Sequence, residues 1–189
     1  VKDSKTTQAE VTKALNNLKE ATDKLVLKKD PAIASVGTFK ELKAAINNPK
    51  VKNIQINKNI KLTETLKVSS EKHINGNGYT LTAEIRGKGN NPYTIEFDKT
   101  VGSVSNIKIT GADVALLVNS STVTLSGKID VSGNKVAGII VSKGSKSAKH
   151  QPKLDITNAT LVNTDEANNK PTILEEHIAS TNTPNAVIG

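Results

Sequence analysis

Five triplets of this sequence decide the expected fold, and they are Ile74-Asn75-Gly76, Ile109-Thr110-Gly111, Leu125-Ser126-Gly127, Val131-Ser132-Gly133 and Ile156-Thr157-Asn158. In each triplet an apolar residue closes a short β-type run, and a small polar residue and then Gly or Asn follow. Gly and Asn reach the left-handed backbone region at low cost, so each triplet predicts a strand that ends in a sharp corner. A chain that turns this often predicts a coil of short strands, a β-solenoid.

The spacing of apolar residues agrees with such a coil. One apolar position recurs at steps of 20, 21, 21, 23 and 22 residues, at Ile54, Ile74, Ile95, Leu116, Ile139 and Leu161. This step predicts a three-faced solenoid of five to six coils, mainly β, with three short strands and three corners in each coil. The expected strands cover residues 53–56, 72–74, 79–81, 93–97, 106–109, 115–118, 123–125, 129–131, 138–141, 154–156 and 159–162, and residues 172–174 are either one more strand or an irregular tail.

Two helices are expected before the strands. In residues 7–26 the apolar positions, which begin at Val11 and Leu15, share one helical face, and Thr7 with Glu10 forms a capping box. A second helix over 38–47 opens with another capping box, Thr38 with Glu41. An open solenoid end exposes core side chains and strand edges, so this second helix is predicted to cap it. We therefore divide the chain into a helical part, 1–30, and a β-solenoid domain, 31–189.

Composition excludes several kinds of function. The chain has no Cys, so disulfides, thiol catalysis and thiolate metal sites are excluded, and it has no Met, which indicates a processed or excised piece of a longer protein. No run approaches the roughly 20 apolar residues that a membrane helix needs, so no membrane insertion is expected. The net charge is +8, but Arg86 is the only arginine and aromatics make up 2%. Nucleic-acid readers usually rely on Arg and aromatic stacking, so no nucleic acid is expected as a partner.

Two stretches resemble known families of bacterial surface proteins. The residues Thr7-Gln8-Ala9-Glu10-Val11, followed by Ala14-Leu15 and Leu18, look like the last helix of a FIVAR-type module. Residues 36–162 resemble a pectate-lyase-like adhesive domain, through Thr38-Phe39-Lys40-Glu41-Leu42, the strand Ile54-Gln55-Ile56 and the corner that runs from Ile74 to Leu81. The resemblance implies a right-handed parallel β-helix on a Gram-positive, cell-wall-associated surface protein, with an adhesive or interaction role.

The acidic residues do not form the pattern of a polysaccharide lyase. Such an enzyme needs grouped carboxylates that hold calcium beside an Arg or Lys base. The acids expected on the coils are well separated in sequence, at Glu84, Glu96, Asp98, Asp113, Asp130 and Asp155. Asp130 and Asp155 could stack on neighbouring coils and hold a cation, but nearby lysines are expected to neutralise them instead. His73, His150 and His177 match no local metal or nucleophile motif. No catalytic residue, cofactor or metal is therefore predicted.

Two sets of residues are candidates for binding. One is a lysine-rich loop between coils, which holds Lys143, Lys146, Lys149 and Lys153 and could attract an anionic polymer. The other is the pair Tyr79 and Tyr93, because sugar binding generally favours an aromatic platform. Paired threonines such as Thr122 and Thr124 put hydroxyls on one strand face, which suits sugar binding but is also common in outward-facing β-positions.

The leading hypothesis is a non-catalytic adhesion module of a bacterial surface protein. Its expected partner is an anionic or neutral polysaccharide, or a host or matrix protein, and its expected place is outside the cell, anchored to the wall through other segments. The alternatives are a polysaccharide lyase or hydrolase on the same scaffold and a purely structural stalk. A carboxylate cluster in a groove would favour the enzyme, and a smooth polar surface would favour adhesin or stalk.

Overall fold

The protein is described by a computed structural model, which covers residues 8–24, 32–85, 92–144, 151–165, 168–176 and 187–188. The chain divides into two units, residues 1–30 and 31–189. The first contains α1 (Gln8–Lys24), so the helix expected over 7–26 is confirmed, while the Thr7 cap lies outside the described residues. The apolar stripe of α1 is solvent-exposed, with Leu15 64% and Leu18 63% accessible.

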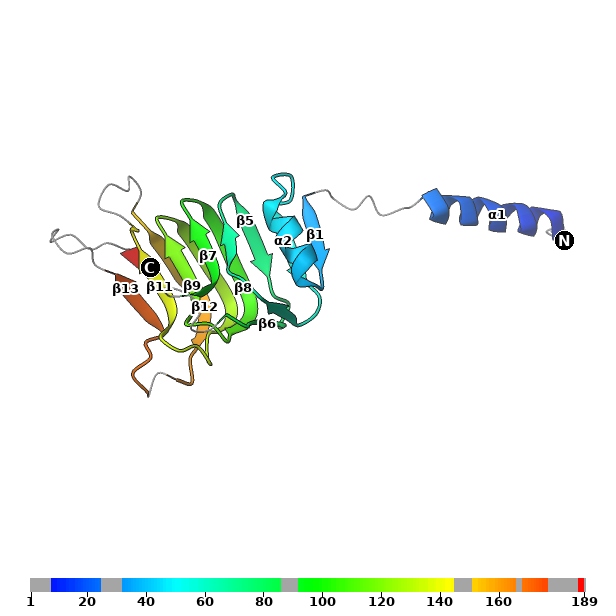
Figure 1. The fold of residues 1–189 in the computed structure, drawn as a ribbon. Helices are drawn as coiled ribbons and strands as arrows, with labels where there is room; N and C mark the ends of the chain where they lie inside the picture. Colours follow the sequence, from blue (N-terminus) through cyan, green and yellow to red (C-terminus); the bar gives the residue numbers. More distant parts are fainter. Residues whose placement is uncertain are drawn as a thin grey trace. The chain divides into compact units, whose positions relative to one another are not determined.

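The second unit is mainly β and consists of two parallel sheets (Figure 1). The nine-stranded sheet contains β1 (Ile33–Val36), β2 (Asn53–Ile56), β3 (Ile60–Leu62), β5 (Lys72–Asn75), β6 (Thr80–Ala83), β8 (Val101–Thr110), β10 (Thr122–Asp130), β12 (Lys153–Val162) and β14 (Val187–Ile188). The five-stranded sheet contains β4 (Leu66–Val68), β7 (Tyr93–Asp98), β9 (Val114–Asn119), β11 (Ala137–Ser142) and β13 (Ile173–Glu176). Every strand pair among the described residues is parallel. Such an arrangement is consistent with a β-solenoid.

Successive coils stack because the chain passes from one sheet to the other and back. The first two coils have three strands each, β2-β3-β4 and β5-β6-β7, of which the first two belong to the nine-stranded sheet and the third to the five-stranded sheet. From the third coil onward one long strand replaces the first two, because β8 pairs with both β5 and β6. In Figure 1, β1 and the helix α2 (Phe39–Asn47) lie at one end of the stack and β13 lies near the other.

The register corrects the predicted repeat. Ile95, Leu116 and Ile139 are partners in the five-stranded sheet, as the steps of 21 and 23 residues predict. Ile74, however, pairs with Val104 and not with Ile95. The predicted series of equivalent positions therefore passes from the nine-stranded sheet, at Ile74, to the five-stranded sheet, at Ile95. Leu161 pairs with Ile129 and again belongs to the nine-stranded sheet. The coils differ in length because some carry long connections, and the step from Ile139 to its partner Ile173 is 34 residues.

Two of the five predicted corners are absent. β10 continues through Leu125-Ser126-Gly127, and β12 continues through Ile156-Thr157-Asn158, so the four short strands expected there are two long ones. The register shifts at both places, which marks irregular β-bulges where the strands bend without ending. The other corners are confirmed, since β8 ends at Thr110 before Gly111, β10 ends at Asp130 before Ser132-Gly133, and β5 ends at Asn75.

The core between the sheets is aliphatic, with Phe97 as its one fully buried aromatic side chain among the described residues. Lys72 also points inward and is fully buried, and its Nζ donates hydrogen bonds to the Asn48 carbonyl at 3.2 Å and to Ser70 Oγ at 3.0 Å. Burial lowers the pKa of the Lys72 ammonium. Since Asn48 is the C-cap of α2, this cation lies where the helix dipole is negative and joins the helix to the second coil.

The N-terminal end of the stack is closed by α2 and β1. Thr38 caps α2, and both hydrogen bonds of the capping box with Glu41 are present. Leu42 and Ile46 are buried in the common core, so the predicted cap packs on the first coil. β1 adds a parallel strand to β2 and was not predicted, because Ile33-Ala34-Ser35-Val36 has no corner motif before it.

Candidate functional site

The outer face of the nine-stranded sheet carries continuous rows of polar side chains. One row has Asn53, His73, Ser103, Thr124 and Asp155 at successive register positions. The next row has Ser35, Gln55, Asn75, Ser105, Ser126 and Asn158. Neighbouring rungs are about 4.8 Å apart, as in any β-sheet. Parts of both rows line a shallow depression of about 240 Å³ over β2, β5 and β8. The sheet therefore offers hydroxyl and amide groups at a regular spacing.

A larger hollow of about 500 Å³ lies on the same sheet where it bends. Its lining comes from the β5–β6 turn, from the first residue of β6, from β8 and from β10. The lining residues are Asn77, Gly78, Thr80, Asn106, Ile107, Lys108, Lys128 and Asp130. β8 lines both depressions, first with Ser103 and Ser105 and then with Asn106 to Lys108. We call the eight lining residues the bend hollow.

A β-bulge shapes the bend hollow. In the β8–β10 ladder, Ser126 pairs with Ser105 and Ile129 pairs with Ile107, so Gly127 and Lys128 together face Asn106. Gly127 has φ +65°, and a Cβ atom there would lie 2.1 Å from Asn106 Oδ1, so only glycine fits without a shift. Asn106 itself has φ +48°, in the left-handed region that Asn tolerates. The bulge interrupts the pairing of Lys128 with β8, while its pairing with Thr160 of β12 is kept, and the Lys128 side chain is exposed at the hollow.

The two lysines of the bend hollow differ in whether a carboxylate neutralises them. Lys108 Nζ lies 3.2 Å from Asp130 Oδ2, and Asp130 Oδ1 accepts a hydrogen bond from the Ser132 backbone N–H at 3.0 Å. Partial burial acts to raise the pKa of Asp130, but the Ser132 hydrogen bonds and the Lys108 ammonium outweigh it and hold the pKa below its usual value. Lys128 has no carboxylate within ion-pair distance in the described part of the chain. The hollow thus has one net positive charge.

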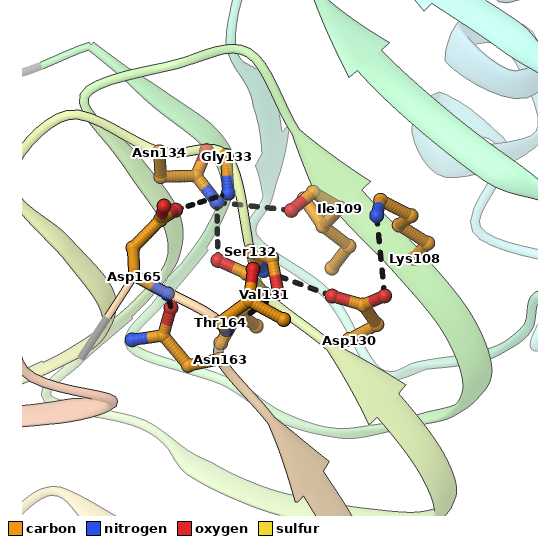
Figure 2. A network of polar contacts seen from close by, with 10 residues as sticks. All are labelled: Lys108, Ile109, Asp130, Val131, Ser132, Gly133, Asn134, Asn163, Thr164 and Asp165. Atoms are coloured by element: carbon orange, nitrogen blue, oxygen red, sulfur yellow. Dashed lines mark hydrogen bonds and ion pairs between the residues drawn. The ribbon is translucent and has the colours of Figure 1, made fainter. Parts of the chain in front are cut away.

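A polar network fixes the turn that follows Asp130 (Figure 2). The buried Asn134 side chain donates to the carbonyls of Ile109, at 3.0 Å, and Val131, at 2.8 Å, and accepts from Ala112 N–H. On the next coil, Thr164 N–H donates to Ser132 Oγ at 3.0 Å, and the Asp165 carboxylate accepts from Gly133 N–H. Three successive coils are tied together at this corner, so the end of β10 beside the hollow is rigidly placed.

The predicted binding residues are not gathered in one place. Of the four loop lysines, Lys153 begins β12 and is exposed, Lys143 follows β11, and Lys146 and Lys149 lie outside the described residues. Tyr79 precedes β6 and is 37% exposed. Tyr93 belongs to the five-stranded sheet and packs against a buried cluster of Val114, Leu117, Ala137 and Ile140. Tyr79 therefore lies beside the nine-stranded sheet, whereas Tyr93 lies in the five-stranded one.

Asp130 and Asp155 do not stack on each other. Asp130 pairs with Val162 in the next strand, whereas Asp155 pairs with Thr124, so the shared cation site considered from the sequence is wrong. The expected neutralisation by lysine is confirmed for Asp130 through Lys108. Asp155 instead accepts hydrogen bonds from Thr157, whose backbone N–H lowers the pKa of that carboxyl. The bulge in β12 separates the two acids in register.

The sequence does not predict the bend hollow, because Leu125-Ser126-Gly127 has the pattern of a strand end. A signal was present: Val123, Leu125, Ile129 and Val131 keep an even spacing, and all four are buried. That spacing puts Gly127 on the inner side of one continuous strand, and a glycine inside a strand pattern is a common sign of a bulge. The partners Asn77 and Asn106 come from other coils, so no local motif joins them to Lys128.

Several other carboxylates on the coils are bound to lysines of an adjoining turn. The pairs are Lys43–Glu64, Lys52–Glu71, Lys61–Glu84 and Lys67–Asp98, with the last at 2.8 Å. The hydrogen bond to Asp98 raises the pKa of Lys67. Within the described ranges, no three His, Asp or Glu side chains gather as a metal site requires. Glu64 links the first coil to α2, and the other acids link one coil to the next.

Comparison with protein families agrees with this architecture. The model of the putative pectate lyase-like adhesive domain matches residues 33–187, which span almost the entire β-unit. The chain belongs to this family. Neither the curated proteins nor the solved structures include a significant match. Among the described residues, no helix has the length and apolar character needed to cross a membrane.

Proposed function

We propose that this protein is a non-catalytic adhesion module on a bacterial surface protein, built as a right-handed parallel β-helix that binds polysaccharide through the outer face of its nine-stranded sheet. A host or matrix protein is the alternative partner. α1 would be the last helix of a preceding FIVAR-like module, and the protein would be held at a Gram-positive cell wall by segments outside residues 1–189.

The observation that carries this proposal is the row of polar residues across six strands, from Ser35 to Asn158. Polysaccharides are repeating chains of hydroxyl groups, and a β-sheet presents donors and acceptors at a repeat of about 4.8 Å. Gln55, Ser105 and Ser126 have no hydrogen-bond partner for their side chains among the described residues, so they are free to bind sugar hydroxyls. Membership of an adhesive family supports the same function.

The arrangement of the acids favours binding over lyase chemistry. A calcium-dependent lyase needs carboxylates that are free to coordinate the ion. Here Glu64, Glu71 and Glu84 each contact a lysine of α2 or of a neighbouring coil at 2.8 Å or less, and Asp130 contacts Lys108. A lysine ammonium at that position competes with a metal ion for the same oxygens.

A binding array on the purified chain tests this proposal. It should contain neutral and acidic polysaccharides and matrix proteins, and the double variant Gln55→Ala/Ser105→Ala should be compared with wild type. We expect binding to a polysaccharide that the double variant weakens, while Thr63→Ala/Ser69→Ala, exposed and outside both rows, leaves it unchanged. A parallel ultraviolet assay with polygalacturonate and calcium should give no unsaturated product. Steady product formation by wild type would overturn the non-catalytic assignment.

A further inference from the structure

We infer that the bend hollow is a specific subsite for the singly charged anionic group, a carboxylate or a sulfate ester, of an acidic polysaccharide, with Lys128 as its charged contact. This inference rests on the proposed function, because it names the class of polysaccharide that the nine-stranded sheet binds. It differs from the lysine-loop hypothesis, which places the anion contact on Lys143, Lys146, Lys149 and Lys153.

The charge balance of the hollow selects a monoanion. Lys108 is already neutralised by Asp130 at 3.2 Å, which leaves the ammonium of Lys128 without a counter-ion in the described part of the chain. One free positive charge matches one carboxylate or one sulfate ester, and a charge-assisted hydrogen bond to an ammonium is stronger than a neutral one. A doubly charged group would exceed the charge available.

Two neutral donors accompany Lys128. The side chains of Asn106 and Thr80 line the hollow and have no hydrogen-bond partner among the described residues. The Asn77 amide, in contrast, is occupied, because its Nδ2 donates to the Ile56 carbonyl at 2.9 Å. A charged donor flanked by an amide and a hydroxyl suits a sugar ring that carries an acidic group beside free hydroxyls.

The surroundings favour a polysaccharide over a small anion. β8 carries the lining from the hollow at Lys108 to the shallow depression at Ser103, so both depressions lie along one strand. The shallow depression is lined by Asn, Gln, Ser, Ile and His and contains no Lys, Asp or Glu. An acidic sugar in the hollow would therefore continue onto an uncharged hydrogen-bonding surface.

The backbone of the hollow is fixed in advance. The position of Lys128 follows from the Gly127 bulge. The end of its strand is tied to the neighbouring coils through Asp130, Ser132 and Asn134 (Figure 2). A site whose backbone does not rearrange loses less conformational entropy on binding.

The test compares Lys128→Gln with Lys135→Gln, which removes the same charge from the exposed turn after β10, outside the hollow. The probes are polygalacturonate for carboxylate, dextran sulfate for sulfate ester and dextran as the neutral polymer. We expect wild type to bind at least one acidic probe more tightly than dextran. Lys128→Gln should lower that affinity about tenfold, the loss of one charge-assisted contact, and should flatten its salt dependence, while Lys135→Gln should change neither.

A second variant, Thr80→Val, removes one hydroxyl and keeps the shape. It should weaken binding to the same acidic probe about threefold without changing the salt dependence, since no charge is lost. Thermal melting of each variant checks that the fold is kept, which the exposure of Lys128 predicts.

The outcomes separate this inference from the proposed function. Acidic probes that bind Lys128→Gln as tightly as wild type would overturn the subsite, and so would binding by wild type to neutral polymers or matrix proteins alone. In both cases an adhesive role would stand. If wild type binds no polysaccharide and no matrix protein, both proposals fail.

Discussion

The outward-facing residues of the two sheets of the β-unit differ in how far they are buried. In the nine-stranded sheet buried and accessible residues alternate, as in β2 and β3, and the outer residues of these two strands are polar. In the five-stranded sheet, β11 is buried along its entire length, and β9 along all but its last residue. Leu117 and Ile140 point away from the main core and form a second apolar cluster with Tyr93. The outer face of one sheet is therefore open to a ligand, while that of the other is already packed at its centre.

The largest expected effect comes from an acid on the packed sheet. Ile139→Asp, in the main core, and Ile140→Asp, in the second cluster, should each cost several kcal/mol, because an unpaired carboxylate is buried in both cases. Ser105→Asp, on the outer face of the open sheet, should change the melting temperature little. If Ile140→Asp melts like wild type in a thermal unfolding experiment, the outer face of the five-stranded sheet is not packed.

The next effect concerns the closed end of both sheets. Deletion of residues 1–47 removes β1 and α2 and exposes the parallel edge of β2, which should make the protein aggregate. Deletion of residues 1–29 leaves both elements in place and should be mild. Light scattering and size-exclusion chromatography measure the difference, and a soluble monomer from the longer deletion would contradict the capping role.

The bulge that shapes the open sheet can be tested with two glycines. Gly127→Ala combines a positive φ with a Cβ 2.1 Å from Asn106 Oδ1, so it should cost about 2 kcal/mol or more. Gly78→Ala also has a positive φ, of +81°, but its Cβ meets nothing within 4 Å, so it should cost about 1 kcal/mol. Urea unfolding of both variants isolates the steric part, and equal losses would show that Asn106 moves aside.

A smaller effect is expected from the Lys108–Asp130 pair. The pKa of Asp130 is lowered in the folded state, so its contribution is complete above the unfolded pKa, near 4, and is lost as the pH falls through the lower folded value. Asp130→Asn should cost about 1 kcal/mol at pH 7 and progressively less below pH 4. Unfolding measured across this range should show the two proteins converging. A constant difference would mean that packing, not charge, is lost.

The smallest effect on stability is expected at the lysine loop. Changing Lys143, Lys146, Lys149 and Lys153 together to Gln should leave the melting temperature unchanged. If the loop contributes diffuse attraction to an anionic polymer, the variant should bind more slowly at low salt and equally fast at high salt, because screening removes long-range steering. Association rates at two salt concentrations give this readout. If the variant and wild type associate equally fast at low salt, the loop is only a solvated connection between coils.

The sequence predicts the class of fold better than the geometry of the site. Corners such as Ile109-Thr110-Gly111 and the α2 capping box are local, and local backbone preferences determine them. The bend at Gly127 looks like a corner in sequence, because the same residue type serves a strand end and a bulge. The sequence does not predict β3 and β4, because Ile60-Lys61-Leu62 and Leu66-Lys67-Val68 are too short to show a period.

The contents of the site depend on register, which the sequence did not reveal. Asn106, Lys128 and Thr80 come together only because β8 pairs with β6 on one side and with β10 on the other. The irregular coil lengths moved the predicted repeat onto the wrong sheet, so residues of different coils could not be aligned correctly. A single sequence indicates which segments form strands. Which strands pair, and in what register, depends on the lengths of the connections between them.

The unequal lengths of the coils show that this fold tolerates insertions and deletions between its strands. Closing a loop costs entropy that grows only with the logarithm of its length. The 34-residue step from Ile139 to Ile173 therefore costs only about 0.4 kcal/mol more than the 21-residue step from Ile95 to Leu116. Since each rung contacts only its neighbours, an insertion between rungs leaves the others unchanged. A scaffold of this kind can acquire or lose surface loops at almost no thermodynamic cost while its ladder of rungs stays the same.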